Sequence, residues 1–216
     1  MNSIKLINIS DKQLSHSKYN IGYSSSTFVQ KRVIDISLSS LIIVSTAPIM
    51  LYTIYKIRKE SKGSIIFKQS RIGLNGKSFT CYKFRSMHTN SKFNPYTEDN
   101  DSRIFPFGKF MRKTRIDELP QLWNVIKGDM HIIGPRAEWD ILVDKYKKVI
   151  PKYQYRHFVR PGITGLAQVS YHYGRDTNDA KQKLKYDLDY IENWSIGLEL
   201  KVAWKTVATV FGQKGV

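Results

Sequence analysis

The stretch ISLSSLIIVSTAPIMLYTIY, residues 36–55, contains twenty residues and no charged side chain. A helix needs about twenty apolar residues to cross a hydrocarbon core of roughly 30 Å. A helix with no polar face is also a poor fit to the surface or core of a soluble protein. A removable signal peptide is the poorer interpretation, because the stretch begins late and lacks a suitable cleavage site. The stretch therefore predicts a helix inside a lipid bilayer.

The flanks of this stretch indicate how its helix enters the bilayer. Lys and Arg gather on the cytoplasmic side of a spanning helix, but here they lie on both flanks: Lys31 and Arg32 before it, and Lys56, Arg58, Lys59 and Lys62 after it. Pro48 removes a backbone donor near the middle and favours a bend. We expect a re-entrant helix that breaks at Pro48 and returns to its own leaflet. An ordinary bent spanning helix stays open as the alternative.

The composition restricts the partners of the chain. Its formal net charge of +17 favours phosphate, nucleic acid or an anionic membrane. With 41% hydrophobic residues, the chain is not a disordered basic tail. A single cysteine, Cys81, excludes an intrachain disulfide, and five scattered histidines offer no tetrahedral zinc site without carboxylate ligands. Any metal is therefore expected to be bound by oxygen.

The remaining segments predict an α+β fold, a small helix-rich domain with a short β-hairpin. Two strands, residues 64–69 and 77–84, flank Asn75-Gly76, a strong two-residue turn signal. Residues 90–103 are polar and predict an exposed loop. The periodic segments predict five helices at residues 104–114, 117–127, 138–149, 179–193 and 196–211. We divide the chain into a polar extension (1–29), the membrane helix with its flanks (30–62) and a catalytic domain with C-terminal amphipathic helices (63–216).

The densest chemical signal is RKTRIDELPQ, residues 112–121, in which two carboxylates follow a basic turn. A helix starting at Asp117 would place its positive dipole end there, attract phosphate and keep Asp117 ionised. Adjacent helical residues point about 100° apart, so the two carboxylates suit different roles. Asp117 can attack phosphorus, Glu118 can bind magnesium, and Arg112 can neutralise the phosphate. The alternative is structural, with Asp117 as a helix cap and Glu118 as a dipole partner.

Three further basic positions are weaker candidates when taken singly. Lys83 alternates with aromatic residues in a strand, where a solvated face is the alternative. Gly134-Pro135-Arg136 and the RPGITG segment, residues 160–165, each present an arginine beside a rigid turn. A purely structural turn is the alternative for both.

Taken in order, the motifs resemble the bacterial sugar transferase family, the monotopic phosphoglycosyl transferases. The resemblance covers residues 30–211 and rests on KRVIDISLS, FKQSRIGLNGKSF, YKFRSM, RKTRIDELPQLWNVIKGDM, IIGPR, RPGITGLAQV and YDLDYIENWSIGLELKVAWKT. It implies a membrane-associated α+β domain on a broken helix, magnesium, a nucleotide diphosphate sugar donor, generally a UDP-sugar, and a polyprenyl phosphate acceptor. It also implies the bacterial inner membrane, a cytoplasmic catalytic domain, and a place at the start of exopolysaccharide or lipopolysaccharide synthesis.

The resemblance also implies a role for each motif residue. Asp117 would attack the sugar-proximal phosphate, expel the nucleoside monophosphate and carry a phosphosugar that polyprenyl phosphate then accepts. Glu118 would bind magnesium. The residues that would engage phosphates or donor are Lys83, Arg112, Arg136 and, as a weaker match, Arg160. Two positions depart from the family pattern: Ala47 replaces the serine before Pro48, and Ala137 replaces the proline after Arg136.

Two other functions compete with this interpretation. A nucleic-acid-binding module would account for the charge and interleaved aromatic residues, but the long apolar stretch opposes it. A membrane-anchored basic scaffold that binds anionic lipid without turnover is the second alternative. The sequence leaves open which sugar is transferred, the carrier length, the polymer and whether the chain forms a homo-oligomer.

Overall fold

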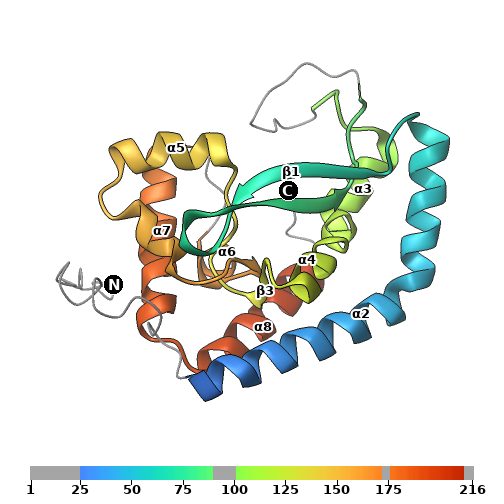
Figure 1. The fold of residues 1–216 in the computed structure, drawn as a ribbon. Coiled ribbons are helices and arrows are strands. Elements are labelled where there is room, and N and C mark those ends of the chain that lie inside the picture. The colour runs from blue at the N-terminus through green and yellow to red at the C-terminus, as the bar shows by residue number, and fades with distance from the viewer. Residues whose placement is uncertain (1–24, 90–100, 172–175, 212–216) are drawn as a thin grey trace.

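The protein is described by a computed structural model that covers residues 25–89, 101–171 and 176–211. It is mostly helical, with two small sheets (Figure 1). The helices are α2 (Ser25–Glu60), α3 (Pro106–Thr114), α4 (Gln121–Lys127), α5 (Asp140–Val149), α6 (Leu166–Ser170), α7 (Thr177–Glu192) and α8 (Ile196–Phe211). The strands are β1 (Ile66–Ile72), β2 (Ser78–Phe84), β3 (His131–Ile133) and β4 (Gly162–Thr164), and the 3-10 turns are η1 (Leu74–Gly76), η2 (Ile116–Glu118) and η3 (Tyr153–Phe158). Residues 1–24 of the expected extension, and residues 90–100 of the expected loop, lie outside the described residues.

Helix α2 runs for 36 residues and changes direction between its blue and cyan halves (Figure 1). Pro48 is the proline inside this helix, and proline is the commonest cause of a sharp kink. The hydroxyl of Thr46 donates to the carbonyl of Ile42 at 2.6 Å, and the hydroxyl of Ser45 donates to the same carbonyl at 3.1 Å. Such back-bonding also bends helices, so both features favour the observed change of direction.

The apolar part of α2 is largely uncovered by the rest of the chain. The helix is long and apolar enough, over Val29–Glu60, to cross a membrane, and only 11% of its most apolar window is buried. The exposed fractions of Leu41, Val44 and Leu51 are 64%, 73% and 67%. The core helix of a soluble protein would bury such residues, so the exposure is consistent with membrane association.

The predicted hairpin is confirmed, with slightly shifted ends. Strands β1 and β2 pair antiparallel, from Ile66 opposite Phe84 to Ile72 opposite Ser78. Asn75 and Gly76 have φ of 55° and 73°, the left-handed conformation expected of this pair in a turn. The connection is longer than the two residues expected, because residues 73–77 lie between the last paired residues, Ile72 and Ser78.

The second sheet was not anticipated, because β3 and β4 contain three residues each. They pair in parallel and bring together the turns at Gly134 and Gly162. The N–H of Gly134 donates to the carbonyl of Thr164, and the N–H of Gly162 donates to the carbonyl of Pro135, both at 2.9 Å. A Cβ added to Gly162 would lie 2.1 Å from the backbone nitrogen of Gly134, so only glycine permits this close approach.

The helix expected at residues 117–127 is the main error in the secondary structure. Arg115 adopts a left-handed conformation that ends α3, η2 follows, and α4 begins only at Gln121 after Pro120. Pro120 has no N–H, so it fits the entry to a helix better than its interior. Asp117 therefore does not occupy the start of a long helix, and the dipole argument for its ionisation is wrong. The other four expected helices are present, with ends shifted by two residues or fewer.

Candidate active site

Asp117 and Glu118 lie on η2, between α3 and α4, and each is only 8% exposed. Oε1 of Glu118 accepts from Nζ of Lys83 at 2.8 Å and from Nη2 of Arg136 at 3.3 Å. Lys83 belongs to β2, and Arg136 follows the turn after β3. Two distant segments therefore bring cations to the carboxylates of η2, and we call Lys83, Asp117, Glu118 and Arg136 the site cluster.

The cations of the site cluster keep Glu118 ionised. Burial by itself would raise the pKa of Glu118, but the charges of Lys83 and Arg136 outweigh it and hold the pKa well below its usual range. Attraction to Glu118 in turn raises the pKa of Arg136. Glu118 is thus a fixed negative charge, as a metal ligand must be.

Asp117 lies in a different environment from its neighbour. Burial raises its pKa above the usual value, Lys83 and Arg112 oppose this shift, and Glu118 adds to it. Its Oδ1 is buried and has no hydrogen-bond partner among the described residues. Buried polar atoms are normally paired, and an unpaired one points to a function or to a missing ligand. A carboxylate oxygen without a hydrogen-bond partner is suited to attack an electrophile.

Two residues near the site were missed by the sequence reasoning. Arg71 is on β1, and its Nη1 donates to the carbonyl of Ala137 at 2.5 Å, next to Arg136 in the chain. Gln121 begins α4, is 3% exposed, and its Nε2 has no hydrogen-bond partner in the part of the chain that the structure describes. Both belong to the quoted motifs, but neither residue type singles out a role without the fold.

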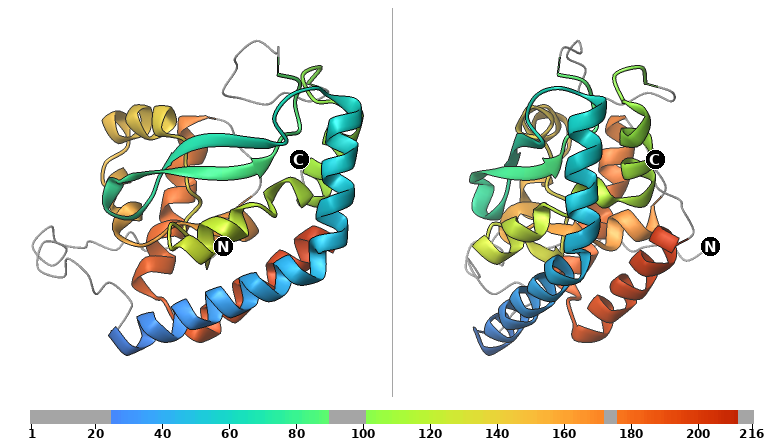
Figure 2. Two further views of the ribbon diagram at one scale, coloured as in Figure 1. Left: turned by 45° about the vertical axis from the view of Figure 1, so that its right-hand side comes forward. Right: turned by 90° about the vertical axis from the view of Figure 1, so that its right-hand side faces the viewer.

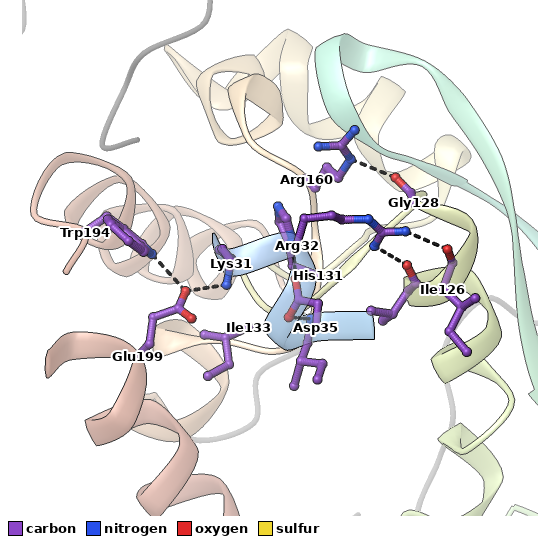
Figure 3. A network of polar contacts seen from close by, with 12 residues as sticks. Lys31, Arg32, Asp35, Ile126, Gly128, His131, Ile133, Arg160, Trp194 and Glu199 are labelled. Carbon is purple, nitrogen blue, oxygen red and sulfur yellow. Dashed lines mark hydrogen bonds and ion pairs between the residues drawn. The ribbon is translucent and has the colours of Figure 1, made fainter. Parts of the chain in front are cut away.

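The structure places Arg112 and Arg160 differently. Arg112 lies in the last turn of α3 and acts on the pKa of Asp117 through its charge. Nε of Arg160 donates to the carbonyl of Gly128 at 2.7 Å, at the end of α4 (Figure 3). A helix leaves its last carbonyls without partners inside the helix, so this bond gives Arg160 a capping role. The charges that act on the pKa of Arg160 include those of Arg32, Asp35 and Asp129, and its role in donor binding stays a prediction.

A second group of charges, buried or partly buried, joins α2 to the rest of the protein, and Figure 3 shows its arrangement. We call it the root cluster: Lys31, Arg32, Asp35, His131 and Glu199. Nζ of Lys31 lies 2.5 Å from Oε1 of Glu199 on α8, and Oδ2 of Asp35 lies 2.5 Å from Nδ1 of His131 on β3. Nη2 of Arg32 donates to the carbonyl of Ile126 on α4 at 2.6 Å. The first half of α2 is thereby fixed beside α8, as Figures 1 and 2 show.

The residues suit magnesium only with help from a substrate. No group of three or more His, Cys, Asp or Glu residues that could hold a metal occurs among the described residues. Both hydrogen bonds to Glu118 reach Oε1, which leaves Oε2, and Oδ1 of Asp117 is unpaired. Magnesium commonly takes one or two carboxylates and completes its shell with substrate phosphates and water. The donor set therefore fits a magnesium–diphosphate complex rather than a metal held by protein alone.

Comparison with known proteins places these features in a family. The family model described as bacterial sugar transferase matches residues 26–213. The chain is 44% identical, over 83% of its length, to the UDP-N-acetylgalactosamine-undecaprenyl-phosphate N-acetylgalactosaminephosphotransferase of Aeromonas hydrophila, of which it covers 43%. It is 43% identical, over 86% of its length, to the UDP-glucose:undecaprenyl-phosphate glucose-1-phosphate transferase of Klebsiella pneumoniae, of which it covers 41%.

A shorter relative has nearly the same extent as this chain. An uncharacterised sugar transferase of Bacillus subtilis is 38% identical over 87% of this chain and is covered over 90% of its own length. The chain thus spans less than half the length of the Aeromonas and Klebsiella relatives and most of the Bacillus relative.

Proposed function

The chain belongs to the bacterial sugar transferase family, and from this we propose that it transfers a sugar 1-phosphate from a UDP-sugar to undecaprenyl phosphate, as a first step of polysaccharide synthesis. The named relatives act on UDP-N-acetylgalactosamine or UDP-glucose and on undecaprenyl phosphate. The observation that carries the proposal is the site cluster, in which cations from two distant segments surround a buried pair of adjacent carboxylates.

The proposed reaction has two displacements at one phosphorus atom. Asp117 attacks the phosphorus that bears the sugar, the bond from this phosphorus to the bridging oxygen breaks, and UMP leaves with that oxygen. An aspartyl phosphosugar remains on the enzyme. A phosphate oxygen of undecaprenyl phosphate then attacks the same phosphorus and releases the carboxylate of Asp117, which gives an undecaprenyl diphosphate sugar. No proton has to be transferred in either step, because both attacking groups are anions.

The surrounding residues reduce the electrostatic repulsion between the attacking carboxylate of Asp117 and the negatively charged diphosphate. Lys83, Arg136 and Arg112 offer positive charge where the diphosphate would bind, and buried, preorganised charge is more effective than charge in water. Glu118 would hold magnesium through its remaining oxygen, and the ion would neutralise the diphosphate. Because Glu118 stays ionised and would hold the metal, Asp117 is the carboxylate that remains to act as the nucleophile.

Asp117→Asn tests the covalent step. We expect the phosphosugar adduct to disappear and UMP release to fall by at least about 10³-fold, because an amide is a poor nucleophile. Mass spectrometry of the intact protein and UMP assays with both donor types check this. Asp144→Asn is the matched control, since Asp144 is an exposed carboxylate on α5. Full transfer by Asp117→Asn would show that Asp117 is not the nucleophile. Absence of UMP release from the unsubstituted protein with every UDP-sugar would favour the alternative of a basic, lipid-binding scaffold without turnover.

We further propose that residues 30–62 form a re-entrant element, with the catalytic domain, residues 63–216, on the cytoplasmic side of the inner membrane. The bend in α2 and the basic residues on both flanks support this topology. Single cysteines at Asn20 and Lys62, in a Cys81→Ser background, should both react with a reagent confined to the cytoplasm. Pro48→Ala restores a backbone donor and should move position 20 to the other side. Opposite labelling before that substitution would establish a spanning helix.

A further inference from the structure

Arg156, on η3, is a buried cation that the proposed reaction does not use. It is 5% exposed, and its Nη1 donates to the hydroxyl of Tyr153 at 2.7 Å. Its Nη2 forms an ion pair with Oδ2 of Asp187 on α7 at 2.7 Å and donates to the backbone carbonyl of Arg136 at 2.9 Å. A buried pair of this kind costs desolvation and is weak evidence for stability, so the bond to Arg136 needs a separate account.

Arg156 acts on the same residue whose side chain reaches Glu118. Arg136 donates to Glu118 through its guanidinium and accepts from Arg156 through its carbonyl. The next carbonyl, of Ala137, accepts from Arg71. Two arginines, the buried Arg156 and the half-buried Arg71, therefore hold the carbonyl groups of the successive residues Arg136 and Ala137.

These two bonds restrict the backbone on both sides of Ala137. Alanine, unlike proline, does not restrict the backbone at its own position. Hydrogen bonds to consecutive carbonyls restrict the same peptide groups from outside. The planar guanidinium suits this task, because it can bond an acid, a hydroxyl and a carbonyl in one fixed geometry.

We propose that Arg156, held by Asp187, is a positioning residue that fixes the backbone of Arg136 so that its guanidinium stays on Glu118 and on the donor diphosphate. This inference rests on the proposed function. Asp187 orients Arg156 and balances its charge through Nη2, while the hydroxyl of Tyr153 accepts from Nη1. Arg156 itself touches no reacting atom in this account, and its effect is transmitted through Arg136.

A double-mutant cycle distinguishes positioning from a general contribution to folding. Arg156→Lys keeps the charge but cannot make all three contacts at once, and should lower kcat/KM by about 10- to 100-fold. In an Arg136→Gln background the same substitution should lower it by less than about 3-fold, because residues that act as a unit are not additive. Losses that multiply in full would overturn the proposal. The assay is UMP release from UDP-N-acetylgalactosamine and UDP-glucose with undecaprenyl phosphate.

Arg85→Lys is the matched control for Arg156→Lys, because Arg85 is also a buried arginine that donates to backbone carbonyls. Arg85 is 6% exposed and donates to the carbonyls of Ser61 and Ser64, away from Arg136. Its effect, whatever its size, should multiply with that of Arg136→Gln. If Arg156→Lys fails to fold, Asp187→Asn, which keeps the side-chain shape, takes its place in the cycle and should show the same coupling.

The dissociation constant of UDP, measured by calorimetry, separates this inference from the proposed function. Absence of turnover in the unsubstituted protein would reject the transferase proposal. In that case, non-additive weakening of UDP binding by Arg156→Lys and Arg136→Gln would still support the positioning role. Additive weakening would overturn it.

Discussion

The site cluster and the root cluster both bury charge, but they differ in how completely their atoms are paired. In the root cluster, Oε1 of Glu199 accepts from Lys31, from the hydroxyl of Tyr190 and from the indole N–H of Trp194. Both carboxylate oxygens of Asp35 also have partners. In the site cluster, Oδ1 of Asp117 has none among the described residues.

This difference separates structural from chemical use of buried charge. A saturated polar network makes one arrangement unique, and its removal leaves uncompensated charge. A polar network with an unpaired buried atom costs stability, and it is retained where a ligand or a reaction will use that atom. Substitutions in the root cluster should therefore act on stability, and those in the site cluster should act on activity.

Asp35→Asn should show the largest effect on stability. It weakens the buried hydrogen bond between Oδ2 of Asp35 and Nδ1 of His131. Because burial lowers the pKa of His131, the ring is neutral at pH 7, and the loss is that of a hydrogen bond to a charged group, about 1.5–3 kcal/mol. We expect Tm to fall by roughly 3–12 °C in detergent. The exposed Asp144→Asn should leave Tm within about 2 °C. An unchanged Tm for Asp35→Asn would show that the root cluster does not hold α2.

Lys83→Met should show a loss of activity and a change in its pH dependence. Lys83 lowers the pKa of Asp117 and of Glu118, so its removal makes both acids harder to ionise. We expect UMP release to fall by about 10²–10³-fold and the acidic limb of the pH profile to move to higher pH. Lys127→Met, at a half-exposed lysine, is the control. A limb that stays in place would contradict the assigned electrostatics.

Besides its large effect on activity, Asp117→Asn should have a small effect on stability, an increase, which is the smallest of the effects expected here. Because burial raises the pKa of Asp117 above its ordinary value of 3.8, the folded protein binds this proton more tightly than the unfolded chain. Stability therefore falls as pH rises from 3.8 through the raised value, and the loss persists at neutral pH. Removing the charge should raise Tm at pH 7 by about 2–4 °C, for a gain of about 1 kcal/mol. Thermal scans at pH 7 and pH 4 should show the gain shrinking in acid.

Local features of the chain were predictable from the sequence. The uncharged run gave α2, Asn75-Gly76 gave the hairpin turn, and the basic turn before Asp117 pointed to the site. Each of these depends on neighbours in sequence, so propensity and pattern suffice.

Features that join distant segments were not predictable. Strands β3 and β4 are too short for a pattern, and their pairing depends on glycine backbones, those of Gly134 and Gly162, that approach each other across 28 positions. Arg160 belongs to a turn like that of Arg136, yet it caps α4 because that helix end lies next to it. The ionisation of Asp117 depends on burial, which only the fold defines.

The root cluster also determines where the apolar part of α2 could be exchanged between members of the family. Lys31, Arg32 and Asp35 contact three different elements within little more than one helical turn, and Ser39 is buried one turn later. An insertion of one residue between Arg32 and Asp35 would rotate Asp35 by about 100° relative to Lys31 and Arg32, so that the three could not all reach their partners. A chimeric helix should therefore be joined downstream of Ser39, so that the recipient retains its own docking turn and only the exposed apolar length of α2 is replaced.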